Sequence, residues 1–281
     1  MQQLGYYNGS FGPLEDMTVP MNDRGCYFGD GVYDAAYSRN HVIFTLNEHV
    51  DRFFRSAEMI GIRLRQTKEE LKAILNDMLR RLEPGEYFVY WQVTRGTAVR
   101  VHAFPESDPP PNLWIMIKPG AVLPLDMKVK LRTVEDTRHL RCNIKTLNLL
   151  PNVLASEAAA RAGASEAIFH RGDRVTEGAR SNVHILRDGV FRTAPADNFI
   201  LPGVARAHLI KACGALGIPV DESPFTVDGM MAADEILISS AGSLGHAAEE
   251  IDGLSVGGKA PELLEKLHKY LWNEFLEETK S

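Results

Sequence analysis

A lysine at a predicted strand-to-helix junction is the feature that most constrains this chain. Residues 129–134 are predicted to form a strand and residues 152–162 a helix, and Lys145 lies between them, directly after Ile144 and before a run of leucines. Lysine is strongly hydrated and is rarely buried unless it is paired or covalently used. A partly desolvated lysine has a lowered pKa, which suits Schiff-base chemistry. Most lysines are surface residues, so a catalytic role for Lys145 needs support from the rest of the sequence.

Composition indicates a soluble globular protein. The 281 residues are 44% hydrophobic and 24% charged, which allows one large domain or two of ordinary size. A net charge of -6 argues against a general binder of nucleic acid or of anionic membranes, and no stretch has the length and apolar character that a bilayer span requires. Cys26, Cys142 and Cys213 are far apart and have no metal-binding spacing, so we expect a cytoplasmic protein without a bound metal or disulfides.

The order of predicted strands and helices indicates two domains of mixed α+β character. We place the boundary within residues 118–121, where Pro119 and Gly120 interrupt the pattern. This gives a smaller N-terminal domain of residues 1–119 and a larger C-terminal domain of residues 120–281.

Turn and capping residues define the predicted N-terminal elements. Asn8-Gly9 predicts a two-residue hairpin turn. Residues 47–62 are predicted to be helical, and Thr67-Lys68-Glu69-Glu70 fits a capping box that starts a second helix. A strand is predicted over residues 87–94, and we expect extended backbone to continue from it through residue 102.

Four polar residues of the N-terminal part are candidate site residues. Tyr33 follows a segment with three glycines in seven residues, which predicts tight turns or a close approach of the backbone. Arg52 lies on the first predicted helix, where a surface arginine is the commoner case. Arg100 and His102 are two residues apart, so on an extended backbone both point to the same side and could clamp a carboxylate. The plainer interpretation of this pair is two solvated side chains on an exposed strand face.

The C-terminal part offers a carboxylate and two possible anion sites. Glu177 lies where a strand enters a glycine-bearing bend, although an exposed glutamate is usual there. Gly203 directly precedes a predicted helix over residues 204–216, which leaves bare amides at the helix N-terminus. Ser240-Ala241 follows a predicted strand and offers amides and a hydroxyl to a phosphate, which alone is weak support. Asp188-Gly189 predicts a second hairpin turn.

Taken together and in this order, these features resemble the fold-type IV pyridoxal-phosphate (PLP) aminotransferases, and most closely the bacterial D-amino-acid transaminases. The resemblance covers nearly the whole chain. Its most specific segments are Asp23-Arg24-Gly25 with Phe28-Gly29-Asp30-Gly31-Val32-Tyr33, Asn47-Glu48-His49 with Asp51-Arg52, Gln92-Val93-Thr94-Arg95-Gly96-Thr97 with Arg100 and His102, Arg141-Cys142 with Ile144-Lys145, Leu147-Asn148-Leu149-Leu150, and Val175-Thr176-Glu177-Gly178 with Ser181-Asn182-Val183.

The resemblance implies a fold and an activity. The expected fold has a smaller N-terminal α/β domain and a larger C-terminal domain whose mixed sheets form a pseudo-barrel. The implied reaction is a ping-pong transamination between a D-amino acid, such as D-alanine, D-glutamate or D-aspartate, and 2-oxoglutarate or pyruvate. The implied assembly is a homodimer in which each active site is shared across the interface.

The resemblance also implies residue roles. Lys145 would hold PLP as an internal aldimine and then move the proton between the substrate Cα and C4′ of the cofactor. Glu177 would pair with the pyridine nitrogen and keep the ring an effective electron sink. Arg52 would bind the phosphate, and Glu166 would orient Arg138. Arg138 would contact the phenolic oxygen of the cofactor. Further cofactor contacts are implied for Leu201, Gly203, Val204, Ala205, Ser240 and Ala241, and the substrate α-carboxylate is expected at Tyr33, Arg100 and His102.

Several positions depart from the D-amino-acid transaminase pattern. Asp34 replaces a common glutamate, Ala179-Arg180 replaces a serine pair, and Ala205 and Ala241 replace threonines at the phosphate. Residues 244–248 lack the usual Thr-Pro-Val, which leaves the preferred substrate open. The alternatives are a branched-chain L-amino-acid transaminase, an aminodeoxychorismate lyase, and a catalytically silent PLP-binding protein.

Overall fold

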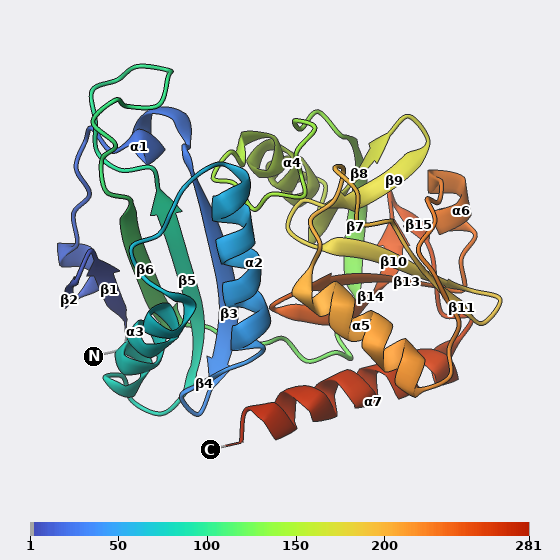
Figure 1. Cartoon of the computed structure of the whole chain (residues 1–281). Helices are drawn as coiled ribbons and strands as arrows, with labels where there is room; N and C mark the ends of the chain where they lie inside the picture. The colour runs from blue at the N-terminus through green and yellow to red at the C-terminus, as the bar shows by residue number, and fades with distance from the viewer. Residues whose placement is uncertain (1–2, 281) are drawn as a thin grey trace. The chain divides into compact units, whose positions relative to one another are not determined.

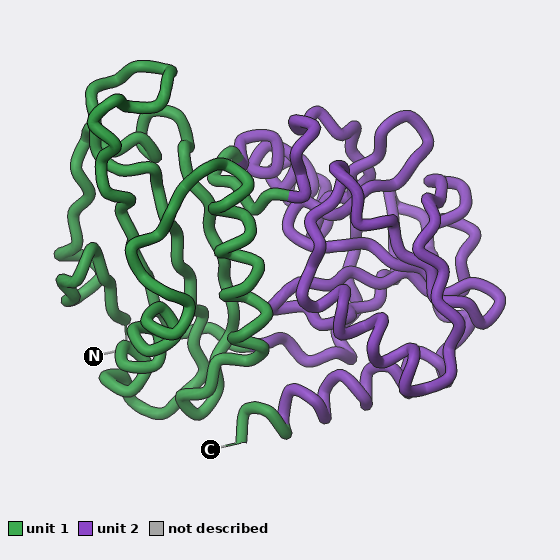
Figure 2. Tube along the Cα trace, viewed as in Figure 1, with its two compact units in different colours: residues 1–121, 144–148, 277–281 green, residues 122–143, 149–276 purple. Residues whose placement is uncertain are grey.

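The computed structural model describes residues 3–280, which divide into two compact units (Figure 2). Unit 1 consists of residues 1–121, 144–148 and 277–281, and unit 2 of residues 122–143 and 149–276. The sequence places a single boundary after residue 119. In the structure the first long segment ends at Ala121, and the pentapeptide around Lys145 belongs to unit 1 because its backbone bonds to a strand there.

Unit 1 is a six-stranded antiparallel sheet in the order β2-β1-β6-β5-β3-β4 (Figure 1). Helices α2 and α3 cover one face of this sheet. The strands are β1 (Leu4–Tyr7), β2 (Ser10–Gly12), β3 (Gly31–Arg39), β4 (Val42–Ile43), β5 (Glu86–Thr94) and β6 (Asn112–Pro119), and the helices are η1 (Leu14–Asp16), α1 (Arg24–Phe28), α2 (Leu46–Met59) and α3 (Lys68–Arg80).

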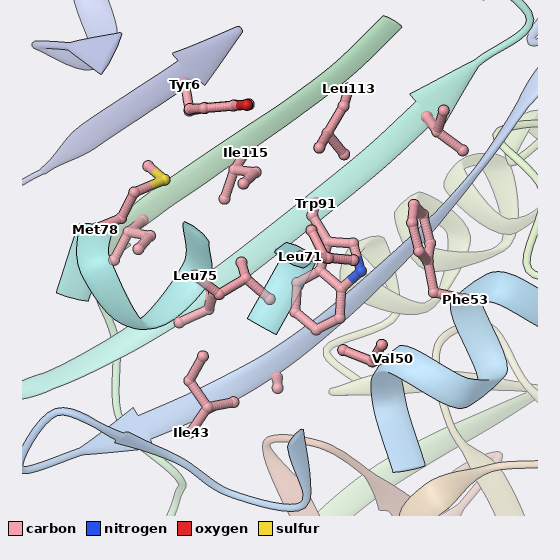
Figure 3. Packing of buried hydrophobic residues seen from close by; sticks show 14 of the residues in the cluster. Tyr6, Ile43, Val50, Phe53, Leu71, Leu75, Met78, Trp91, Leu113 and Ile115 are labelled. Atoms are coloured by element: carbon pink, nitrogen blue, oxygen red, sulfur yellow. The ribbon is translucent and has the colours of Figure 1, made fainter. Parts of the chain in front are cut away.

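The core of unit 1 lies between the sheet and its two long helices (Figure 3). Trp91 of β5 and Phe53 of α2 are fully buried and meet edge to face, with ring centroids 6.2 Å apart. Leu71 and Leu75 of α3 are also fully buried. Alternate side chains of β5 enter this core, which explains the strand pattern of its sequence.

Local sequence patterns predict several elements of unit 1 correctly. The hairpin at Asn8-Gly9 joins β1 to β2. The capping box of α3 is present: the Glu70 amide donates to Thr67 Oγ1 over 3.2 Å, and the Thr67 amide donates to a Glu70 carboxylate oxygen over 2.7 Å. These interactions involve residues within four positions of each other, so the sequence alone contains them.

The predicted extension of β5 through residue 102 is wrong. The strand ends at Thr94, and Gly96 turns the chain with φ of +105°, a conformation that favours glycine. A Cβ at Gly96 would also clash with the carbonyl of Pro110. Arg100 and His102 therefore lie on an irregular loop rather than on one face of a strand.

Unit 2 contains a nine-stranded mixed sheet in the order β12-β11-β10-β13-β14-β7-β8-β9, with β15 beside β14. The sheet curls, so that β9 at its edge also lies near β10 (Figure 1). The predicted α+β class and mixed C-terminal sheet are confirmed. The strands are β7 (Val129–Glu135), β8 (Glu166–Arg171), β9 (Arg174–Gly178), β10 (Asn182–Arg187), β11 (Val190–Thr193), β12 (Val220–Asp221), β13 (Glu235–Ser240), β14 (Ser243–Ile251) and β15 (Leu254–Ser255).

Helices pack against the sheet of unit 2. Helix α4 contacts β7 and β8, α5 contacts β13 and β14, and α6 contacts β9. The predicted Asp188-Gly189 turn joins β10 to β11, with φ of 52° and 74° at its two residues. The helices are α4 (Leu150–Arg161), α5 (Val204–Ala215), α6 (Val227–Met231) and α7 (Pro261–Glu278), whose last two residues group with unit 1.

Within residues 3–280, no helix has both the length and the apolar character that crossing a membrane requires.

Candidate functional site

The pentapeptide Ile144–Asn148 is bound to the first half of β3. The Tyr33 amide donates to the Lys145 carbonyl over 2.9 Å, and the Leu147 amide donates to the Gly31 carbonyl over 3.0 Å. Gly31 permits this approach, because a Cβ there would clash with the Val93 carbonyl and lie 2.8 Å from Leu147 Cδ1. The glycines before Tyr33 therefore serve the close backbone approach that the sequence predicted.

The Lys145 side chain lies against Tyr33. Its Nζ is 3.4 Å from the Tyr33 hydroxyl and 4.4 Å from the centre of the Tyr33 ring. The ring of Tyr33 in turn stacks on Tyr90, with centroids 5.4 Å apart. Lys145 is half-buried, and its amide donates to Ser56 Oγ of α2 over 3.3 Å. Two predicted site residues are thus brought together, and both are held by β3.

Arg52 forms a buried ion pair with Asp34. Its Nε and Nη2 donate to the two carboxylate oxygens of Asp34 over 2.9 and 2.7 Å, and His49 Nδ1 lies 2.8 Å from Asp34 Oδ1. Burial acts to raise the pKa of Asp34, but the charges of Arg52 and His49 outweigh burial and lower that pKa. Burial lowers the pKa of His49. The Nε–Nη2 edge of Arg52 faces Asp34.

Arg100 and His102 lie on the exposed loop after β5. Both approach the ring of Phe28: Arg100 Cζ is 5.1 Å and the His102 ring 5.2 Å from its centroid. Arg24 fixes this part of the loop by donating to the carbonyls of Val101 over 2.7 Å and His102 over 3.4 Å. The structure therefore keeps the predicted pair together, through an aromatic ring and loop contacts rather than through strand geometry.

Glu177 is a buried carboxylate at the end of β9 in unit 2. Its Oε1 accepts a hydrogen bond from Arg138 Nη1. Its Oε2 accepts from the Leu201 amide over 2.9 Å and from Asn182 Nδ2 over 3.2 Å. From the sequence, an exposed glutamate was the usual expectation at this position, but in the fold Glu177 is buried. Buried carboxylates with several donors are typical of functional sites as well as of structural networks.

Asp136, rather than Glu166, orients Arg138. Arg138 donates from Nε to Asp136 Oδ1 over 2.9 Å and from Nη2 to Asp136 Oδ2 over 2.8 Å. Glu166 instead accepts from the Arg180 amide over 2.8 Å and from Ser181 Oγ over 2.9 Å. The expectation that Glu166 orients Arg138 is wrong, because β8 directs Glu166 to the turn between β9 and β10.

Asn182 links Glu177 to the start of α5. Besides its bond to Glu177, its Nδ2 donates to the Leu201 carbonyl over 2.9 Å, and its Oδ1 lies so close to Gly203 that a Cβ there would clash. Gly203 is the N-cap of α5 and provides no side-chain cap. The amides at Val204 and Ala205 therefore begin a helix with a positive N-terminal end.

Ser240 and Ala241 lie at the tight turn between β13 and β14, where Ser240 pairs with Ser243. Helix α5 packs against both strands. The two predicted phosphate-binding segments, the α5 N-terminus and this turn, thus belong to neighbouring elements of unit 2.

A family model described as Amino-transferase class IV matches residues 31–247. The chain belongs to the class IV aminotransferases. It is 43% identical to D-alanine aminotransferase of Staphylococcus epidermidis over 253 residues, which are 89% of this chain and 90% of that relative. It is 40% identical to D-alanine aminotransferase of Listeria monocytogenes over 277 residues, 94% and 93% of the two chains.

Solved structures of the same fold include branched-chain aminotransferases. The Escherichia coli enzyme has a TM-score of 0.90 at 22% identity, covering 100% of this chain and 97% of the other. The enzyme of Thermoproteus uzoniensis has a TM-score of 0.88 at 23% identity, covering 99% and 98%. At these identities the likeness shows a shared fold.

The cofactor of this family is PLP, and residues of this chain suit its functional groups. The half-buried amine of Lys145 suits the aldehyde. The Glu177 carboxylate, buried and bonded by three donors, suits a protonated pyridine nitrogen. The N-terminus of α5, which lacks a side-chain cap, suits a phosphate.

Four residues of these networks were not identified as functional from the sequence. Asn182 was within a quoted motif, and Asp34 was noted only as a departure from the family pattern. Asp34 directly follows Tyr33 on β3, so strand alternation points it to the opposite face, toward α2. The alternation of Tyr33 and Asp34 along the strand could have suggested that Asp34 pairs with Arg52 of α2. His49 was likewise within a quoted motif, beside Asp51-Arg52, whereas Asp136 lay in no such motif.

Proposed function

We propose that this protein transfers the amino group of a D-amino acid, such as D-alanine, D-glutamate or D-aspartate, to pyruvate or 2-oxoglutarate in ping-pong half-reactions. The observation that carries the proposal is the identity of 40–43% to D-alanine aminotransferases over about nine tenths of the chain. Bound PLP would supply the electron sink that stabilises negative charge at the substrate Cα.

Lys145 is the proposed catalytic residue. Its amine would bind the cofactor covalently and later carry the proton between the substrate Cα and the cofactor. Tyr33, 3.4 Å from that amine, would fix its position and donate its hydroxyl to the substrate carboxylate. A proton carrier works only within hydrogen-bond reach of the reacting atoms, so the position of Lys145 beside β3 matters as much as its chemistry.

Glu177 is the proposed partner of the pyridine nitrogen. Its two oxygens are fixed by Arg138, Asn182 and Leu201, so the carboxylate would meet the cofactor without reorganising. Arg138 and Leu201 would thus support the carboxylate that meets the cofactor, and Arg138 is also the proposed contact of the cofactor's phenolic oxygen. The proposed phosphate contacts are Arg52, the start of α5 at Gly203, Val204 and Ala205, and the turn at Ser240 and Ala241.

Arg100 and His102 are the proposed clamp for the substrate carboxylate, contributed to the active site of a second copy in a homodimer. Exposed apolar side chains adjoin the clamp at Val99, Val101 and Phe104. A second exposed apolar group lies on α4, where Leu150, Val153 and Leu154 share one helical face. Apolar groups of this kind mark association surfaces, and a second copy would cover them.

Mixing two impaired variants, assayed at substrate concentrations far below the raised KM of Arg100→Ala, tests the shared active site. Lys145→Ala and Arg100→Ala subunits, unfolded together and refolded, form hybrids in which one site carries both changes and the other neither. If Arg100 acts across the interface, activity should return to about a quarter of the wild-type value, because half of the dimers are hybrids with one intact site. A mixture as inactive as its parents at a dimeric mass would contradict the shared site, and a monomeric mass would contradict the homodimer.

We also propose a cytoplasmic location. Cys26 is an exposed free thiol, and Cys142 and Cys213 are buried free thiols. Such thiols suit a reducing compartment. Fractionation of the producing cells with an antibody to the chain tests this location, and recovery with the extracellular fraction would contradict it.

Substrate specificity is tested by half-reactions. The PLP-loaded protein should lose its near-visible absorbance on addition of D-alanine and regain it with 2-oxoglutarate. Turnover of L-leucine alone would instead indicate a branched-chain L-amino-acid transaminase, and pyruvate release from aminodeoxychorismate would indicate the lyase. Absorbance that no amino acid changes would indicate a silent PLP-binding protein.

A further inference from the structure

Asp136 is the most heavily hydrogen-bonded carboxylate of unit 2 that has no role in the proposed reaction. It lies in the connection after β7, and its side chain is inaccessible to solvent. Besides two bonds from the Arg138 side chain, it accepts from the Arg138 amide over 3.0 Å, from Arg171 Nε over 3.1 Å and from Thr176 Oγ1 over 3.2 Å. A buried carboxylate with this many donors is costly to disturb, which suggests a specific task.

Arg138 connects Asp136 to Glu177. Its Nε and Nη2 donate to the two carboxylate oxygens of Asp136 as a bidentate pair, while Nη1 donates to Glu177 Oε1. The planar guanidinium has a fixed fork geometry, so gripping two atoms of Asp136 sets the direction of Nη1. Burial acts to lower the pKa of Arg138, but its hydrogen bonds to Asp136 and the charge of Glu177 outweigh burial and raise that pKa. The arginine is therefore a permanent cation.

Further contacts hold Arg138 in place between Asp136 and Glu177. Arg138 also donates from Nη2 to the Phe199 carbonyl over 3.2 Å and stacks on the Phe169 ring with Cζ 4.4 Å from its centroid. Arg171 donates to the Arg138 carbonyl over 3.0 Å. Cys142 lies near enough to sense the charges of Arg138, Glu177, Asp136 and Arg171, and burial raises its pKa to about 11, so this thiol stays neutral.

We propose that Asp136 is a positioning residue that acts on Glu177 through Arg138. Asp136 orients the guanidinium so that Nη1 keeps donating to Glu177 Oε1. The Glu177 carboxylate then stays ionised and directed toward the position proposed for the pyridine nitrogen. This inference rests on the proposed role of Glu177 toward the pyridine nitrogen. Asp136 is bonded to Arg138, Arg171 and Thr176, so its effect on Glu177 should pass through Arg138.

The test reads Glu177 directly in protein without cofactor. Glutamate is labelled with ¹³C at the carboxyl, the Glu177 signal is assigned by its loss in Glu177→Gln, and its titration is followed in wild type, Asp136→Asn, Arg138→Met and the double variant. Asp136→Asn should raise the titration midpoint of Glu177 by about one pH unit, because the arginine no longer holds the carboxylate as an anion. In the Arg138→Met background the same change should shift the midpoint at most slightly.

Three results would overturn the proposal. The first is an unchanged titration midpoint of Glu177 in Asp136→Asn. The second is a lowered midpoint, which would make Asp136 a competing charge rather than a positioning residue. The third is a shift of equal size with and without Arg138. If Asp136→Asn does not fold, as judged by circular dichroism, Arg138→Lys decides the question. Lysine keeps the charge but lacks the fork, so the midpoint should rise there too.

A second arm separates this inference from the proposed function. PLP affinity of the cofactor-free protein, measured by quenching of tryptophan fluorescence, should fall about tenfold in Asp136→Asn, as expected for loss of a charge-assisted contact. Asp252→Asn is the matched control: Asp252 accepts hydrogen bonds from the amide and hydroxyl of Thr133 on β7, but it does not contact Arg138 or Glu177. The PLP affinity of Asp252→Asn should stay within about twofold of the wild-type value. Failure of the wild-type protein to bind PLP would refute the proposed function, while the titration would still decide the role of Asp136.

Discussion

The Tyr33 hydroxyl lies 3.4 Å from Lys145 Nζ, although the two residues are 112 positions apart in sequence. Strand β3 causes this proximity. It carries Tyr33, and it binds the backbone of the pentapeptide that carries Lys145. The distance between the two side chains is thus set by backbone hydrogen bonds on both sides, which restricts the motion of the lysine more than packing alone would.

Replacement of Lys145 by alanine should lower kcat at least about 10³-fold, because the covalent attachment and the proton carrier are lost together. PLP should still bind non-covalently. The measurements are the rate with D-alanine and 2-oxoglutarate and the mass of the protein after borohydride reduction, which should show no attached cofactor. Lys118→Ala, an exposed lysine of the same unit, is the control and should keep wild-type activity. Wild-type turnover by Lys145→Ala would refute the assignment.

Replacement of Arg100 by alanine should raise KM for amino acids and 2-oxo acids about 10- to 100-fold, as expected when a charged hydrogen bond is lost. PLP affinity should not change. Initial rates over a range of substrate concentrations and fluorescence titration with PLP measure the two effects. Arg63→Ala changes an exposed arginine of the same unit and serves as the control. Loss of PLP with substrate binding intact would show that Arg100 serves the cofactor instead.

Replacement of Gly31 by alanine should displace the pentapeptide that carries Lys145. The new Cβ would clash with the Val93 carbonyl and lie 2.8 Å from Leu147 Cδ1, so we expect a stability loss of about 1–3 kcal/mol together with a lower kcat. Urea unfolding and steady-state rates measure both. The control is Gly214→Ala, since a Cβ at that position in α5 meets nothing within 4 Å. The control should gain about 0.4–1 kcal/mol. Equal effects of the two substitutions would contradict the clash.

Acid should destabilise the protein through His184. This histidine is fully buried between Thr193 and Ser239, and burial lowers its pKa from 6.5 to about 3. The unfolded chain therefore binds a proton that the folded chain does not as the pH falls below about 6.5. Wild type should lose about 1.4 kcal/mol per pH unit relative to His184→Gln from there toward pH 3. Urea unfolding of both proteins at pH 7.5, 6.5 and 5.5 measures this. Parallel stability curves would show that His184 is not buried as a neutral group.

Some features follow from residues close together in the chain, and the sequence alone determines these. Asn8-Gly9 and Asp188-Gly189 form their hairpin turns because each pair can adopt positive φ, and Thr67 caps α3 with Glu70 because the two are three residues apart. The resemblance to the cofactor family also came from sequence alone, because it rests on the order of many short motifs along the chain and not on the neighbours of Lys145 by themselves.

Tertiary structure decided how the candidate residues are held. Asp34 pairs with Arg52 because β3 and α2 face each other, and Asp136 rather than Glu166 orients Arg138 because of where β7 and β8 end. The loop that carries Arg100 departs from an extended strand at Gly96, where a close backbone contact with Pro110 fixes the turn. Each of these contacts depends on which elements the fold makes neighbours. Strand order and curl set that choice, and short sequence patterns do not encode them.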